Sequence, residues 1–324
     1  MSVLRLLARV AALVALALAP LAAAQNYPAR AIRLIVPDAP GGSPDQLARL
    51  LAQALSDGLG QQVFVDNRPG AAGVLAMDAA AKAPPDGYTL AMTTTAIYAI
   101  LPNLKKDLPY DPVRDFIPIS RIATASNVLV VNTSLPVKSI PDLIELAKQK
   151  PGELNYASAG VGSPAHLAGE MLNLLAGIKL THVPYKGAAP ALLDVIAGSA
   201  QLMITSPIAA GGHMKSGRVR ALATTGLERN PVLPDLPTVA DTLPGYEITQ
   251  SWGIAVPSGT PPAIVARLSS EIEKAMRLPE VRDKVQATGA VPVGDSPEAF
   301  TAFMARERER LGEVIRKSGI VLAD

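Results

Sequence analysis

The feature that most constrains this chain is a glycine turn at residues 37–45, which lies between an apolar run and an amphipathic run. Residues 32–36 predict a buried strand, and the leucines after the turn recur at the spacing of one helix face. Ser43 suits the N-cap of that helix, Pro44 its first position, and Gln46 a capping-box partner. Such a unit points backbone N–H groups outward at the positive end of a helix dipole, where an anion binds.

The same turn chemistry recurs in the second half of the chain. Residues 156–168 contain Gly-Ser-Pro-x-x-Leu-Ala, the same pattern that begins at Gly42 in the first turn. Two anion-type turns in two halves of one chain predict one small acidic ligand held between two domains. Ser163 is the expected N-cap of the second helix.

Length and composition fit this interpretation. A chain of 324 residues is long enough for two domains. A hydrophobic fraction of 49% with 4% aromatic residues suits a packed α/β protein. The chain has no cysteine, which excludes a thiol nucleophile, a zinc–thiolate site and an iron–sulfur site.

The first 24 residues predict a secretory signal, and therefore a periplasmic protein. Arg5 and Arg9 precede the apolar run 10–18, and alanines at 22–24 precede the expected cleavage site. A membrane anchor is the alternative, although the uncharged run is shorter than the roughly 20 residues of a spanning helix. Removing these two arginines from 30 basic residues leaves 28 against 28 acidic ones. A chain without net positive charge gives no indication of the basic surface that nucleic acid binds.

Strand and helix patterns alternate after the signal, which predicts parallel sheets with right-handed crossovers. The expected domains are 25–123 plus 223–324 and, between them, 124–222. In the second domain, one helix is expected to bury Leu167, Met171, Leu174 and Leu175. The next helix is expected to bury Leu192, Leu193 and Ile196. Further strands are expected at 62–66, 88–94, 153–158, 180–183, 201–205, 219–224 and 248–256.

Ligands of such sheets bind at the carboxyl ends of the strands, where several turns of this chain fall. Lys186 is the expected cationic contact, with a solvated loop lysine as the alternative. Asp38 would repel an anion unless it pairs with an amine or points away. Trp252 is either core or cleft wall. The predicted ligand-binding residues are Gly41, Gly42, Ser43, Ala71, Thr94, Ser158, Gly160, Gly162, Ser163, Lys186, Gly187 and Thr205.

No cofactor, metal or catalytic centre is expected. Residues 160–165 match a dinucleotide-binding pattern, but no acidic residue ends the following strand at Val183. The three histidines, His166, His182 and His213, lack metal-ligand spacing. Ser43 and Ser163 could be nucleophiles of a secreted hydrolase, although neither lies in Gly-x-Ser-x-Gly.

Longer motifs resemble the Bug-type (TctC-like) extracytoplasmic solute receptors of tripartite tricarboxylate transporters. They include Asn67-Arg68-Pro69-Gly70-Ala71-x-Gly73 and His182-Val183-Pro184-Tyr185-Lys186-Gly187. The resemblance covers essentially all of the chain after the signal. The other matching segments are 27–42, 85–90, 108–112, 156–160 and 236–239.

The resemblance implies a two-domain periplasmic-binding-protein type II fold with the ligand cleft between the domains. It implies a small carboxylate ligand, such as a di- or tricarboxylate, an acidic amino acid or an aromatic acid, held by the two glycine turns. It also implies a monomer that serves integral-membrane permease subunits. A periplasmic sensor acting on a membrane two-component kinase is the alternative. The chain departs from the family at Asp38, at residues 43–45 and at residues 205–207.

Overall fold

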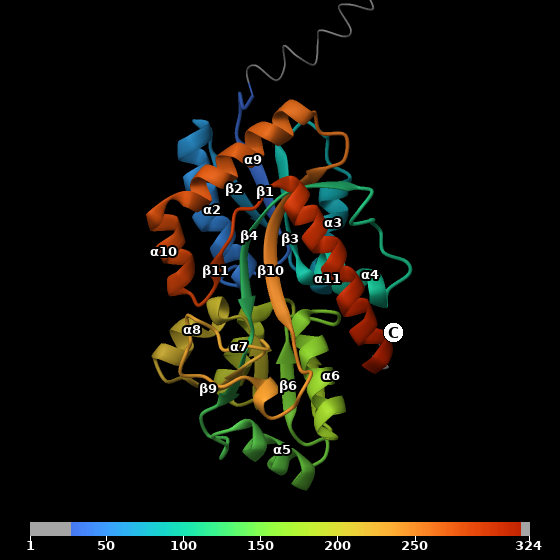
Figure 1. Cartoon of the computed structure of the whole chain (residues 1–324), viewed down its shortest axis with the longest axis vertical. Coiled ribbons are helices and arrows are strands. Elements are labelled where there is room, and N and C mark those ends of the chain that lie inside the picture. Colours follow the sequence, from blue (N-terminus) through green and yellow to red (C-terminus); the bar gives the residue numbers. More distant parts are fainter. Residues whose placement is uncertain (1–26, 319–324) are drawn as a thin grey trace, which may run out of the picture.

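Two β-sheets, each covered by helices, organise residues 27–318, which the computed structural model describes (Figure 1). The six-stranded sheet has the order β11-β4-β10-β3-β1-β2, and the five-stranded sheet has the order β7-β6-β8-β5-β9. We call the parts built on these sheets the first and second lobes. Figure 1 shows them one above the other along the long axis. The predicted signal segment lies outside the described residues.

The first lobe is built on a parallel unit at one side of its sheet. β1 (Ile32–Val36) pairs in parallel with β2 (Val63–Asn67) and with β3 (Thr89–Thr94), which confirms the expected parallel arrangement. The connecting helices are α2 (Ser43–Leu59) and α3 (Val74–Ala81). The buried face of α2 packs in one core with α9 (Pro262–Arg277). The remaining strands of this sheet are β4 (Phe116–Ser126), β10 (Thr249–Pro257) and β11 (Val291–Pro292).

The second lobe repeats the parallel unit. β6 (Asn155–Ser158) pairs in parallel with β7 (Thr181–Pro184) and β8 (Leu202–Thr205), and two antiparallel strands complete the sheet. These are β5 (Val128–Asn132) and β9 (Val219–Thr224). The helices of this lobe are α5 (Ile140–Gln149), α6 (Pro164–Ala176), α7 (Ala188–Ala197) and α8 (Pro207–Lys215).

Three leucines that were expected inside this lobe are exposed. Leu174 is 51% and Leu175 is 41% exposed, because α6 is longer than the strand it covers. Thirteen helical residues span about 20 Å, whereas the four residues of β6 span about 13 Å. The last turn of α6 therefore extends past the sheet. On α7, the buried stripe runs through Leu192 and Val195, which turns Leu193 to solvent.

The chain passes between the lobes at two places that touch each other. Asn127 separates β4 from β5, and residues 225–248 connect β9 to β10. The Thr225 hydroxyl accepts a hydrogen bond from the Asn127 N–H (2.8 Å), and the Thr225 N–H donates to the Asn127 carbonyl (2.9 Å). Both crossovers are therefore held in one hydrogen-bonded junction.

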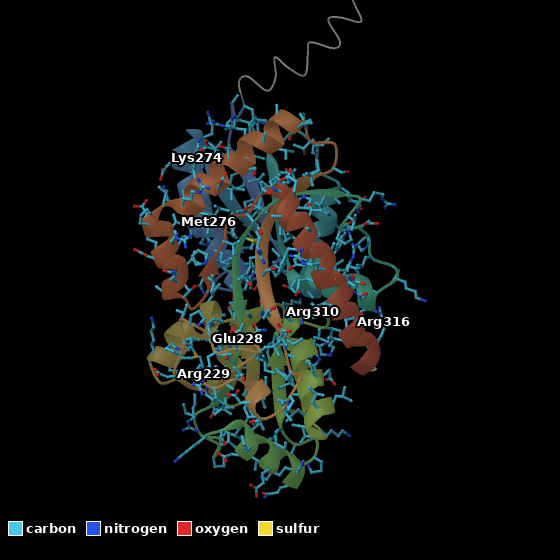
Figure 2. All side chains as sticks on the ribbon, viewed as in Figure 1. Glu228, Arg229, Lys274, Met276, Arg310 and Arg316 are labelled. Atoms are coloured by element: carbon cyan, nitrogen blue, oxygen red, sulfur yellow. The ribbon has the colours of Figure 1, made fainter. Side chains whose placement is uncertain are left out.

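The C-terminal helix α11 (Pro297–Ser318) runs along the side of the first lobe toward this junction (Figure 1). Its Leu311 and Ile315 share a core with residues of the second lobe. Arg310, labelled in Figure 2, binds Glu247 of the second crossover at 2.9 Å. The other α-helices of the described residues are α4 (Leu101–Leu104) and α10 (Pro279–Ala287). Short helical turns lie at Ala71–Gly73, Ala96–Ile100 and Val239–Asp241.

Candidate ligand-binding cleft

A cavity of about 70 Å³ lies between the lobes, at the carboxyl ends of strands from both sheets. The first lobe lines it with Pro37, Asp38, Ser43, Pro44, Gly70, Ala72, Thr94, Ala96, Gln250 and Trp252. The second lobe lines it with Ala159, Ser163, Pro164, Ala165, Gly187, Ala188, Met203 and Thr205. A larger hollow of about 820 Å³ lies over residues 102–114 and α11, and it is open to solvent. Only the smaller cavity joins the turns that the sequence singled out.

Five of the predicted ligand-binding residues lie together on this cavity. They are Ser43, Thr94, Ser163, Gly187 and Thr205. Ser43 and Ser163 therefore face one shared space, although they begin helices in different lobes. Trp252, which is 1% exposed, belongs to the core and also lines the cavity.

The other predicted residues lie beside the cavity or away from it. Lys186 is exposed on its turn. The Gly162 N–H donates to His166 Nδ1 (3.2 Å), and a Cβ at Gly160 would lie 3.6 Å from the backbone nitrogen of Ala72. Gly160 therefore brings the second-lobe turn against the turn at residues 70–73. The remaining residues outside the lining are Gly41, Gly42, Ala71 and Ser158.

The first glycine turn is closed differently from the prediction. Gly42, not Ser43, is the N-cap of α2, and Gln46 donates to the Gly41 carbonyl instead of completing a capping box. The reason is Asp45, whose Oδ2 accepts the Gly41 N–H at 2.8 Å. Burial opposes ionisation of Asp45, but hydrogen bonds from Arg49, Gly41 and Asn67 keep its pKa below the usual value. The Gly41 N–H is thus used within the turn.

Ser43 instead forms a link between the lobes. Its hydroxyl lies 2.5 Å from the hydroxyl of Ser206, which is the N-cap of α8. Sequence reasoning missed both α8 and this contact. The signal for α8 was present, because Ser206-Pro207 repeats the Ser-Pro start of the other two cleft helices. Its two glycines and its short apolar stripe obscured the helix pattern.

The second glycine turn caps its helix as predicted. The Ser163 hydroxyl accepts the His166 N–H at 3.2 Å, and Pro164 occupies the first helical position. Within residues 27–318, no acceptor bonds the N–H of Ala165, the next residue. Ala165 lines the cavity, so α6 presents a hydroxyl and a backbone donor to it.

The turn at residues 70–73 is strained where it meets the cavity. Ala71 has φ of 48° and Ala72 has φ of 53°, a left-handed conformation that side chains disfavour. Such strain persists only where the surrounding structure holds it, and it is concentrated at functional sites. Ala72 lines the cavity directly.

Two stacked histidines support the second-lobe turn. The rings of His166 and His182 lie 4.1 Å apart, and Ser158 Oγ bonds His182 Nε2 at 2.6 Å. Burial, and then the neighbouring His166, lower the pKa of His182 to about 4. The ring nitrogens of these histidines bond Gly162 and Ser158. Within residues 27–318, no histidine ring bonds the hydroxyl of Ser43 or Ser163.

Other classes of site find no support in the described part of the chain. Residues 27–318 hold no cluster of three or more side chains suited to a metal ion. They also include no helix with the length and apolar character needed to cross a bilayer.

Comparison with known proteins places this geometry in a family. The family described as "Tripartite tricarboxylate transporter family receptor" matches residues 47–320. The protein BugT of Bordetella pertussis is 38% identical over 325 residues, covering 99% of this chain and 100% of BugT.

Solved structures agree with this match. An R. palustris protein with adipate is 38% identical with a TM-score of 0.89, covering 91% of this chain and 99% of that protein. MatC from Rhodopseudomonas palustris with bound malate is 31% identical with a TM-score of 0.85, covering 89% and 100%. The periplasmic binding protein BugD is 32% identical with a TM-score of 0.88, covering 91% and 99%.

Proposed function

The chain belongs to the tripartite tricarboxylate transporter receptor family, and we propose that it captures one small carboxylate by closing its two lobes. It is a solute-binding receptor and not an enzyme. Solved relatives carry adipate and malate, which are both small carboxylates. The proposed site is the cavity between the lobes.

The observation that carries the proposal is the chemistry of the lining. The residues around the cavity include no lysine, arginine or histidine, and the hydroxyls of Thr94, Ser163 and Thr205 reach it from both lobes. The free N–H of Ala165 adds a donor at the positive end of α6. Backbone and hydroxyl donors of this kind bind a carboxylate without a fixed cation.

The contacts between the lobes suit closure on a ligand. The Ser43–Ser206 contact joins α2 to α8, and Asp38 accepts the Ala188 N–H at 3.3 Å across the cleft. The neutral hydroxyl pair is worth about 1 kcal/mol and the bond to the carboxylate about 1.5–3 kcal/mol, and a bound ligand would add to this preference for the closed form. A ligand that contacts both lobes binds the closed form more tightly than the open form, and this difference in affinity shifts the equilibrium toward closure.

We propose that the closed receptor works in the periplasm as a monomer and delivers its ligand to integral-membrane permease subunits. The family description and the periplasmic BugD relative support this role. In this proposal each lobe acts as one domain, and the hinge is the Asn127–Thr225 junction. Closure of the lobes would then create the surface that the permease subunits recognise.

A ligand screen tests the proposal. The chain without residues 1–24 is mixed with dicarboxylates, acidic amino acids and aromatic acids, and each acid is paired with its carboxamide. A true ligand at 100 times its Kd adds about 2.7 kcal/mol to the free energy of unfolding and raises Tm, whereas the uncharged amide does not. Absence of any shift and of any calorimetric heat throughout the acid panel would contradict carboxylate capture.

Two matched serine variants locate the site. Ser163 and Ser139 are both N-caps, of α6 at the cavity and of α5 in the other part of the second lobe. We expect Ser163→Ala and Ser139→Ala each to lose about 1 kcal/mol of stability. Only Ser163→Ala should weaken ligand binding, by roughly 10–100-fold, because a hydrogen bond to a charged group is worth about 1.5–3 kcal/mol. If both variants bind the ligand with equal affinity, the ligand does not contact the Ser163 hydroxyl.

A further inference from the structure

Asp38 is the one ionisable side chain that lines the cavity between the described lobes. It follows β1, and its residue is only 6% exposed. One carboxylate oxygen, Oδ1, accepts the N–H of Ala39 at 2.8 Å and that of Ala188 at 3.3 Å. Ala188 begins α7 in the other lobe, so Asp38 already occupies a donor at the start of that helix.

The second oxygen of Asp38 has no partner within residues 27–318. No hydrogen bond reaches Oδ2, and Asp38 takes part in no ion pair of the described region. The fully buried side-chain atoms without a hydrogen bond in that region are Asp78 Oδ1 and His213 Nδ1, so Asp38 Oδ2 is not fully buried, and Asp38 lines the cavity. It lies against Gly42, where a Cβ would be only 2.3 Å away.

Glycines leave the space that the Asp38 carboxylate occupies. A Cβ at Gly187 would lie 2.2 Å from Asp38 Oδ1, so both oxygens lie against glycines. The charged group that perturbs its ionisation is Asp45, which is also negative and raises the pKa of Asp38 further. The carboxylate is therefore held in place by backbone groups and lacks a cation, which is an unfavourable state for a buried charge.

This arrangement acts against a ligand with two carboxylates. A second ligand carboxylate near Asp38 would meet a like charge, and the Ala188 N–H that could bind it is already taken. An ammonium group near Asp38 Oδ2 would instead pair with the buried carboxylate. The carboxylate end of the same ligand would remain free to bind Ser163 and Ala165 on α6.

We propose that Asp38 selects zwitterionic amino carboxylates, with the ligand ammonium on Asp38 Oδ2 and its carboxylate at the start of α6. This inference rests on the proposed capture of a small carboxylate and assigns the second group of that ligand. It separates this receptor from relatives whose structures hold adipate or malate, which carry two carboxylates and no amine.

Calorimetry with two matched ligand series tests the inference. One series is glycine, β-alanine, 4-aminobutyrate and 5-aminopentanoate, and the other is malonate, succinate, glutarate and adipate. Two ligands of equal spacer length differ only at one end, which is an ammonium in the first series and a second carboxylate in the second series. The titrations are made at pH 8, because burial raises the pKa of Asp38 to about 6 and the carboxyl is charged there.

We expect the protein to bind an amino acid of one spacer length at least tenfold more tightly than the matched diacid. In Asp38→Asn this preference should fall at least tenfold. Asp107→Asn, which changes an exposed aspartate outside the cavity, should leave it intact.

The outcomes separate this inference from the function on which it rests. Tighter binding of the diacid at every spacer length, or an unchanged ratio in Asp38→Asn, would overturn the role of Asp38 and leave carboxylate capture standing. A protein that binds neither series nor any acid of the wider panel would overturn both. The comparison within the unaltered protein can overturn the inference even if Asp38→Asn fails to fold.

Discussion

Replacing Asp38 by asparagine should make the folded protein more stable at neutral pH. The amide keeps an oxygen that can accept the N–H groups of Ala39 and Ala188, but it removes the buried charge. Burial raises the pKa of Asp38 from 3.8 to about 6, more than the two backbone hydrogen bonds lower it. The folded state therefore holds this proton to a higher pH than the unfolded chain does.

The sign and size of the effect follow from linkage. Between pH 4 and pH 6 the unfolded chain loses the proton first, so the contribution of Asp38 to stability falls as the pH rises. The pKa rises from 3.8 to about 6, and at about 1.4 kcal/mol per pH unit the full penalty is about 3 kcal/mol. It is nearly complete about one unit above the folded pKa, at about pH 7, and nearly absent about one unit below the unfolded pKa, at about pH 3.

Denaturant unfolding of both proteins at intervals from about pH 3 to pH 8 measures this penalty, with the buried Trp252 as the fluorescent probe. The difference in free energy of unfolding, Asp38→Asn minus unaltered protein, should grow by about 3 kcal/mol across that range. Asp142→Asn provides a control of opposite sign, because hydrogen bonds from Lys138 and Ser139 lower the pKa of Asp142. If the free energies of unfolding of Asp38→Asn and of the unaltered protein change with pH in parallel, burial does not raise the pKa of Asp38.

Two backbone predictions concern the turns at the cleft. Ala72→Gly should stabilise the protein by about 1 kcal/mol, because glycine tolerates the φ of 53° that alanine resists; Ala79→Gly, inside α3, should destabilise it by a similar amount, and thermal melts compare the two. Gly187→Ala should abolish ligand binding in calorimetry, because its Cβ would lie 2.2 Å from Asp38 Oδ1. Gly177→Ala, with φ of 60° and no atom within 4 Å, should cost only about 1 kcal/mol and leave affinity unchanged.

Local sequence chemistry predicted what depends on a few neighbouring residues. The strand before each glycine turn, the Ser163 cap and the glycine ends of α2 and α6 all follow from short-range backbone preferences. The apolar faces were less predictable, because burial depends on how far each helix overlaps its sheet. Leu175 lies one turn beyond the buried Met171 but past the end of the strand.

The cleft itself required long-range information. Ser43 meets Ser206 across 163 residues of sequence, and Asp38 meets Ala188 across 150. Both pairings depend on how the two lobes meet, which no local pattern encodes. The sequence marked Asp38 as an electrostatic conflict, but only the structure shows that it lines the cavity with one oxygen bonded and the other without a hydrogen bond in the described region.

The contacts of Asp38 and of α6 link the choice of ligand to closure of the two lobes. The cavity offers donors without a fixed cation at α6 and a fixed anion without a cation at Asp38. The two ends of a zwitterion satisfy both at once, so ligand binding would offset the stability that the buried carboxylate costs the empty protein. Asp38 belongs to the first lobe, whereas Ala165 and Ala188 belong to the second. A ligand that bridges Asp38 and α6 therefore contacts both lobes, and it favours the closed state by the full strength of whichever contact opening would break.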